Sequence, residues 1–169
     1  LFEDLISVGD VVDVAGKAGL VEAVSLRNVR LRDLAGTVHT VPHSTISTIS
    51  NLTKGFSFYV FDIGVAYRED VDRVMTVLKE LGEEIRRDPE IGPKILEPLE
   101  IFGVDGFADS AVIIKCRFKT APIQQWTVGR AFNRLIKNRF DQLGIEIPYP
   151  HTTVYFGQDR QGHAPPARL

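Results

Sequence analysis

Residues with side chains suited to chemistry are few and dispersed in this 169-residue chain. Its histidines, His39, His43, His151 and His163, fall on predicted strands, turns and the tail, so none of them forms the i, i+4 pair that binds a metal from one helix face, although His39 and His43 are four residues apart. The single cysteine, Cys116, alternates with apolar residues, so we expect a core thiol rather than a nucleophile. The sequence therefore predicts a protein that is not an enzyme, with no catalytic residues, no bound metal and no cofactor.

Arg30 and Arg32 are the strongest candidates for a ligand-binding pair, because alternate residues of a strand share one face. On a small β barrel such arginines could contact RNA phosphates. The chain has 20 Lys and Arg against 22 Asp and Glu, however, and no aromatic stacking set lies beside the two arginines. Interface or solvent-exposed roles are therefore favoured and no nucleic-acid partner is expected, although an RNA-binding module stays open as an alternative.

Residues 9–56 are predicted to form short strands separated by Gly-containing turns, because apolar and polar residues alternate between them. So many short strands in so little chain cannot cover both faces of an open sheet. A small closed barrel of the Sm or SH3 kind removes the exposed edges. The expected strands are 10–14, 20–26, 28–32 and 37–41, with turns at 15–19 and 33–36.

From residue 58 the apolar pattern changes to an alternation of strands and helices. A strand, a helix, two strands, a second helix and a last strand in that order are typical of the ferredoxin-like α+β sandwich. In the second of the paired strands we expect Cys116 to face the core and the alternating cations Lys115, Arg117 and Lys119 to face solvent. The expected strands are 58–66, 99–104, 110–120 and a beginning at 145–147, with a turn at Asp105-Gly106; the expected helices are 69–87 and a segment from Pro122 to Gly144.

The end of the chain carries the most informative local pattern. Pro148 and Pro150 lack the amide hydrogen that a sheet ladder needs, so the chain must change direction there. The next segment has high β-propensity but no strand left in its own chain to pair with, which predicts a symmetric oligomer closed by a ring of such strands. That segment is Thr152, Thr153, Val154, Tyr155 and Phe156.

The sequence thus predicts a small Sm-like (SH3-like) β barrel, a ferredoxin-like α+β domain and a C-terminal strand that pairs with copies of itself in a ring. The expected boundaries are 1–56 for the β domain, 57–147 for the α+β domain, 148–157 for the barrel strand and 158–169 for a flexible tail. The chain begins at Leu1 rather than Met, and we expect it to be a piece of a longer protein.

Six short runs of the sequence stand out as motifs. They are 7–14 with Gly9 and Asp10, 19–27 with Gly19, 29–32 with Arg30 and Arg32, 41–46 with Pro42 and Ser44, 65–67 before an acidic helix start, and 144–150 with Pro148 and Pro150. Together they resemble the small-conductance mechanosensitive channel (MscS-type) family. The resemblance covers essentially residues 1–156, and His43 departs from it, because the family usually has Asn between the Pro and the Ser.

This resemblance implies the cytoplasmic vestibule of a homoheptameric channel in a bacterial-type inner membrane, which releases ions and small osmolytes on hypoosmotic shock. Membrane helices would precede Leu1 and Phe2, and the vestibule would end in a narrow parallel barrel with one strand per subunit. The segment 152–156 falls on that strand. An RNA-binding Sm-like module and a small-molecule-binding ferredoxin-like domain are the alternatives.

Overall fold

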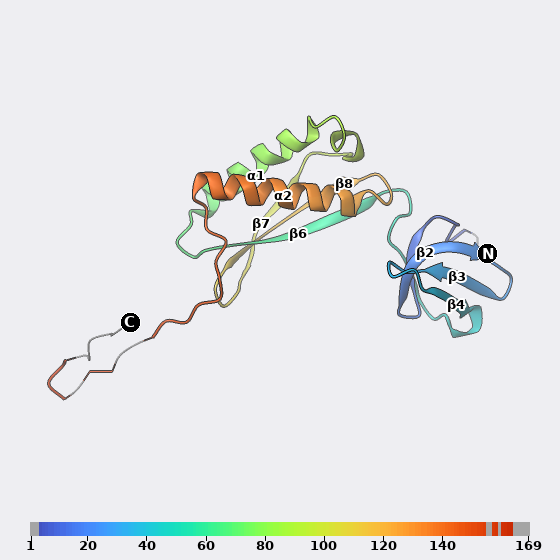
Figure 1. Cartoon of the computed structure of the whole chain (residues 1–169), viewed down its shortest axis with the longest axis horizontal. Helices are drawn as coiled ribbons and strands as arrows, with labels where there is room; N and C mark the ends of the chain where they lie inside the picture. Colours follow the sequence, from blue (N-terminus) through green and yellow to red (C-terminus); the bar gives the residue numbers. More distant parts are fainter. Residues whose placement is uncertain (1–3, 155–156, 159, 164–169) are drawn as a thin grey trace.

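A computed structural model describes residues 4–154, 157–158 and 160–163 (Figure 1). The structure has a β-rich N-terminal part followed by an α+β part, each with its own sheet and its own hydrophobic core. Leu1, Phe2, Tyr155 and Phe156 lie outside the described residues. No helix in the described ranges is both long and apolar enough to cross a bilayer.

The N-terminal part is one five-stranded antiparallel sheet with the order β4-β3-β2-β1-β5. Alternate residues of its strands point inward and are buried, as the period-two pattern predicts. They form a core of Ile6, Val12, Val14, Val21, Val29, Leu31 and Val41. The elements are β1 (Val11–Val14), β2 (Lys17–Val24), β3 (Asn28–Arg32), β4 (Val38–Pro42), the 3₁₀ helix η1 (His43–Thr45) and β5 (Ile49–Asn51).

The first turn is shorter than the sequence suggests. Ala15 and Gly16 have φ angles of 52° and 75°, the left-handed conformations of a two-residue hairpin, so residues 17–19 belong to β2. The predicted second turn is confirmed, and there Asp33 accepts the backbone N–H groups of Ala35 and Thr37 at 2.9 Å. The two outer strands, β4 and β5, are not hydrogen-bonded neighbours among the described residues, so closure into an Sm-like barrel stays a prediction.

The C-terminal part has a three-stranded antiparallel sheet with the order β6-β8-β7, and two long helices cover one of its faces (Figure 1). Its element order gives the first five elements of the predicted ferredoxin-like pattern. The elements are β6 (Ser57–Val65), α1 (Val71–Arg86), the 3₁₀ helix η2 (Gly92–Lys94), β7 (Glu100–Phe107), β8 (Val112–Thr120) and α2 (Gln125–Leu143).

Two predictions about the strands of this part are wrong. Asp105 and Gly106 lie inside β7, because register shifts at 101/103 and 104/106 let the strand continue, and the turn falls at 108–111. No strand forms at 145–147 either. There the backbone makes one contact with the end of β6, in which Ala66 N–H donates to Glu146 C=O at 3.0 Å.

Both helices begin and end at recognisable signals. The Asp70 carboxylate caps α1 by accepting the N–H groups of Asp72 and Arg73 at 3.0 and 3.2 Å. Gly144, with φ 67°, ends α2 in the left-handed conformation that favours glycine. The start predicted at Pro122 is three residues early, because Ile123 has a φ of 71° and therefore cannot be helical.

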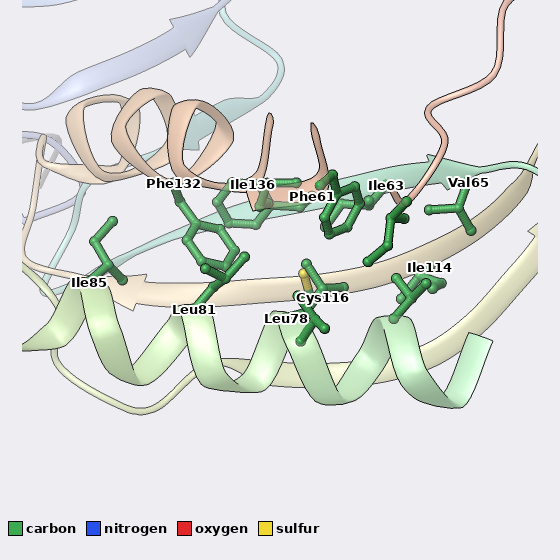
Figure 2. Close-up of a cluster of buried hydrophobic side chains, with 14 of the residues drawn as sticks. Phe61, Ile63, Val65, Leu78, Leu81, Ile85, Ile114, Cys116, Phe132 and Ile136 are labelled. Carbon is green, nitrogen blue, oxygen red and sulfur yellow. The ribbon is translucent and has the colours of Figure 1, made fainter. Parts of the chain in front are cut away.

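The core of the α+β part lies between the sheet and the two helices (Figure 2). The Phe132 ring packs edge-on against Phe61 and Phe118, with centroids 5.1 and 5.0 Å apart. Cys116 is fully buried among these residues, which confirms the predicted core thiol, and Figure 2 shows its sulfur pointing into the cluster. Burial raises the pKa of this thiol to about 12, and the charge of Asp62 adds to the effect.

We therefore expect Cys116 to resist alkylation in the folded protein throughout pH 7 to 9, because the thiolate is the reactive form. A maleimide should label less than a tenth as fast as it labels the same chain in guanidinium chloride, with mass spectrometry as the readout. Equal rates for the folded and unfolded chain would contradict a buried thiol.

Replacing Gly129 should destabilise the α+β part, because a Cβ at that position of α2 would lie 2.3 Å from Cε2 of Tyr59. Overpacking of this kind typically costs about 1–3 kcal/mol, which exceeds the gain of about 1 kcal/mol from a better helix former. Urea unfolding of Gly129→Ala should show that loss. Gly106→Ala is the matched control, since nothing lies within 4 Å of a Cβ there; an equal loss in both variants would refute the steric explanation.

Candidate functional site

The β-domain motif residues hold the first sheet together. Gly9, with φ 95°, donates its N–H to Val21 C=O at 2.9 Å. The Asp10 carboxylate accepts Ser7 N–H at 2.9 Å and the Asn51 side-chain amide at 2.7 Å, which ties β1 to β5. These two residues therefore have contacts that maintain the fold.

Three other motif residues lie at close backbone approaches or at the end of a strand. A Cβ on Gly19 would lie 2.6 Å from the backbone oxygen of Arg32, so only glycine lets β2 and β3 approach this closely. Pro42 ends β4, and its carbonyl accepts the Thr45 hydroxyl at 2.8 Å. Ser44 lies exposed in η1.

Arg30 and Arg32 lie on one face of β3, and both pair with a residue that the sequence analysis did not single out. Glu22 on β2 is 3.4 Å from Arg30 Nε and accepts a hydrogen bond from Arg32 Nε. The bond from Arg32 holds the pKa of the Glu22 carboxyl below its usual range. Both arginines are therefore already paired with a carboxylate, which would compete with an RNA phosphate for them.

The outer face of the second sheet carries a row of cations on β8, as the alternation predicts. Arg117 lies 3.9 Å from the centre of the Phe58 ring and 5.1 Å from that of Phe102, and its Nε donates to Glu100 at 2.6 Å. Lys119 similarly contacts Glu97 at 2.9 Å. These charges are balanced within the sheet face.

The buried polar residues among the described parts of the chain all lie where the two sheets are connected. The Ser57 hydroxyl and the Gln125 side-chain amide both donate to Leu52 C=O, at 3.0 and 3.4 Å. The Thr53 hydroxyl accepts Val11 N–H at 2.9 Å, and Thr120 pairs with Ser57 across β6 and β8. This small polar cluster connects the end of the β-rich part to the start of α2.

A hollow of about 450 Å³ between α1 and α2 is the feature closest to a small-molecule site. Its Asp88 accepts the N–H groups of Ile91 and Glu90 at 2.8 Å, and these bonds hold the pKa of Asp88 below its usual range. The carboxylate is thus engaged by its own loop. Within the described residues no group of His, Cys, Asp and Glu side chains could hold a metal ion.

The C-terminal segment leaves the α+β part after α2 and extends away from it, on the side opposite the β-rich part (Figure 1). Pro148 and Pro150 lie in this extended chain. Thr152, Thr153 and Val154 are exposed, and no strand of the described residues pairs with them. The position of the predicted barrel residues Tyr155 and Phe156 is not described.

A four-residue loop that sequence reasoning missed contacts the base of this segment. Ala66, Arg68 and Glu69 each bond to Glu146, while Tyr67 contacts the turn after β7. These partners lie about 40 to 80 residues apart along the chain, so no local pattern could have revealed them. The sequence indicated this loop only through residues 65–67, which form one of the motifs that resemble the channel family.

Two family profiles match the chain. The profile described as the C-terminal part of the mechanosensitive ion channel MscS matches residues 59–147, and the mechanosensitive ion channel beta-domain profile matches residues 1–54. Among solved structures, a closed-state MscS from Helicobacter pylori is similar with a TM-score of 0.73 and 24% identity over 91% of this chain and 60% of that one. A likeness at this identity supports the fold.

Curated relatives carry channel names as well. The small-conductance mechanosensitive channel of Caldanaerobacter subterraneus is 34% identical over 160 residues, which cover 95% of this chain and 56% of that protein. The moderate conductance mechanosensitive channel YbiO of Escherichia coli is 32% identical over 87% of this chain and 20% of that protein. The chain thus spans little more than half of the first relative and a fifth of the second. Because the two profiles match residues 1–54 and 59–147, this chain belongs to the MscS family of mechanosensitive ion channels.

Proposed function

We propose that this chain is the cytoplasmic vestibule domain of a tension-gated mechanosensitive channel that releases ions and small osmolytes on hypoosmotic shock. Family membership and the names of the curated relatives support this proposal. The pore would be formed by a part of the channel that precedes Leu1 and Phe2 in the inner membrane, with this chain on the cytoplasmic side. Its partners would be copies of itself, the membrane through those helices, and the permeating solutes.

Membrane tension can shift an equilibrium between two channel states only through their difference in area within the bilayer. A vestibule outside the bilayer therefore does not sense tension. It would instead hold the subunits in register and screen the solutes that pass. We retain the division into a closed Sm-like β barrel (1–56), a ferredoxin-like domain (57–147), a barrel strand (148–157) and a tail (158–169) as part of this proposal.

The observation that carries the proposed assembly is the path of the C-terminal segment. Val154 is 67% exposed, and residues 152–154 extend beyond the sheet of their own chain. Apolar segments with strand propensity are stable when they pair, and a closed ring leaves no edge exposed. We propose that segments 152–156 of seven copies form an intersubunit parallel barrel.

The alternatives find less support. Glu22 pairs with both Arg30 and Arg32, which disfavours RNA phosphate binding. The hollow between α1 and α2 has an acidic residue already engaged by backbone N–H groups, which disfavours a small-molecule site. Neither observation affects the vestibule proposal.

The function can be tested by replacing the matching region of the Caldanaerobacter channel with this chain. We expect the chimaera to protect bacteria that lack their own mechanosensitive channels from a sudden drop in osmolarity, and to open under suction in membrane patches. The unaltered channel and the empty vector give the two reference levels. The proposal would be refuted if the chimaera were present in the membrane and survival after the osmotic drop were no higher than with the empty vector.

The assembly role can be tested in the same chimaera by deleting residues 152–156. We expect the deletion to reduce the heptamer fraction at least tenfold in native mass measurements, because each subunit loses its strand pairing on both sides. Deletion of the tail residues 158–169 is the matched control and should leave the heptamer fraction unchanged, with each subunit lighter only by the deleted residues. If the channel without residues 152–156 keeps its heptamer fraction, the segment has no role in assembly. If its ion preference is also unchanged, the segment has no role in selecting ions.

A further inference from the structure

Residues 66–69, here called the exit loop, connect the end of β6 to the start of α1. The exit loop contains part of the 65–67 motif, and the vestibule function by itself assigns no role to that motif. Every residue of the exit loop contributes to contacts around the C-terminal segment. The contacts fall into two groups, one at Glu146 and one at His151.

At the first point, three groups of Glu146 are held by three exit-loop residues. The Glu69 carboxylate accepts Glu146 N–H at 2.9 Å, and Ala66 N–H donates to Glu146 C=O at 3.0 Å. Arg68 Nη2 lies 2.7 Å from the Glu146 carboxylate. The backbone of one residue is thus fixed on both sides immediately after the buried Ile145, and its orientation is determined there.

The second group of contacts holds His151, and Tyr67 contributes to it indirectly. Its ring stacks on Phe107 with a centroid distance of 6.3 Å, and its hydroxyl donates to Ala108 C=O at 2.5 Å. Both partners border the turn between β7 and β8. Ser110 in that turn accepts His151 N–H at 3.3 Å. The exit loop therefore braces the turn that holds the C-terminal segment five residues beyond Glu146.

Between these two points the backbone has little freedom, because Pro148 and Pro150 have fixed φ angles. The contacts themselves lie outside the core: Arg68 has a side-chain exposure of 74% and Tyr67 is 52% exposed. Exposed polar contacts of this kind bury little apolar surface, but they fix the path of the backbone. These contacts are therefore suited to orienting the C-terminal segment after Glu146.

We propose that the exit loop is a clamp that sets the direction in which residues 148–154 leave the subunit, with Glu69 as the main positioning residue. The clamp fixes Glu146 from both sides and thereby prevents the segment from swinging about Gly144. Its use in aligning strands for an intersubunit barrel rests on the proposed function. The clamp itself is a property of one subunit and can be tested alone.

Hydrogen exchange of the whole chain tests the clamp. Glu69→Ala removes the acceptor of Glu146 N–H, and we expect that amide to exchange about tenfold faster, the effect of losing one such hydrogen bond. Glu69→Gln keeps an acceptor oxygen and should restore slow exchange. Glu80→Ala on the exposed side of α1 is the matched control and should equal the natural chain. Unchanged exchange in Glu69→Ala would overturn the clamp.

Direction is measured by electron spin resonance between labels at Lys137→Cys on α2 and Val154→Cys in the segment, with the buried Cys116 left unlabelled. We expect a narrow distance distribution for the natural loop and for Glu69→Gln, and one at least twice as broad for Glu69→Ala. Equal widths in all three, with core amides of β8 still protected, would overturn the positioning role even if the Glu146 amide exchanged faster.

The ion pair gives an independent check within one subunit. Arg68→Glu or Glu146→Arg alone should broaden the distance distribution, and the double exchange should narrow it again, because the pair is re-formed with its charges reversed. Failure of the double variant to narrow the distribution would remove Arg68 from the clamp. If the chimaera forms no heptamer with the natural loop, the proposed function fails while these measurements still decide the clamp.

Discussion

Pro148 and Pro150 impose the constraint on which the rest of the architecture depends. After α2 the chain comes beside the end of β6, where Ala66 N–H bonds to Glu146 C=O, and a fourth strand of the ferredoxin-like sheet could continue from there. A strand needs an amide hydrogen at alternate positions, and proline supplies none. The subunit therefore does not extend its own sheet at this edge, and residues 152–154 lie outside it.

Local patterns were sufficient for elements whose boundaries have local causes. The apolar stripe and the Asp70 cap define α1, and Gly144 ends α2. The turn predicted at Asp105-Gly106 is wrong, because bulges can accommodate a turn dipeptide inside a strand, and whether they do depends on pairing with β8. The contacts of Glu69 with Glu146 were beyond sequence reasoning for the same reason, since they join residues 77 positions apart.

The ion pairs show the same limit of sequence patterns. The alternation of residues predicts the face on which a charged side chain lies, but only the register between strands determines its partner. Alternation placed Arg30 and Arg32 on one face of β3, and it placed Arg117 on the outer face of β8. Their partners come from neighbouring strands: Glu22 from β2 and Glu100 from β7. Once these pairs are known, the cations of β8 are balanced within their face and the two arginines of β3 share one carboxylate, which weakens the argument for nucleic-acid binding.

The two prolines also have a mechanical consequence. An extended chain with fixed φ angles and two attachment points behaves as a short lever rather than a slack tether. In the proposed assembly, a change in the spacing of these segments would be transmitted to β6 and the β7–β8 turn of each subunit as a rotation, with little lost to coiling of the chain. In a ring built from these subunits, the narrow barrel of C-terminal strands and the wider ring of α+β parts would then move together.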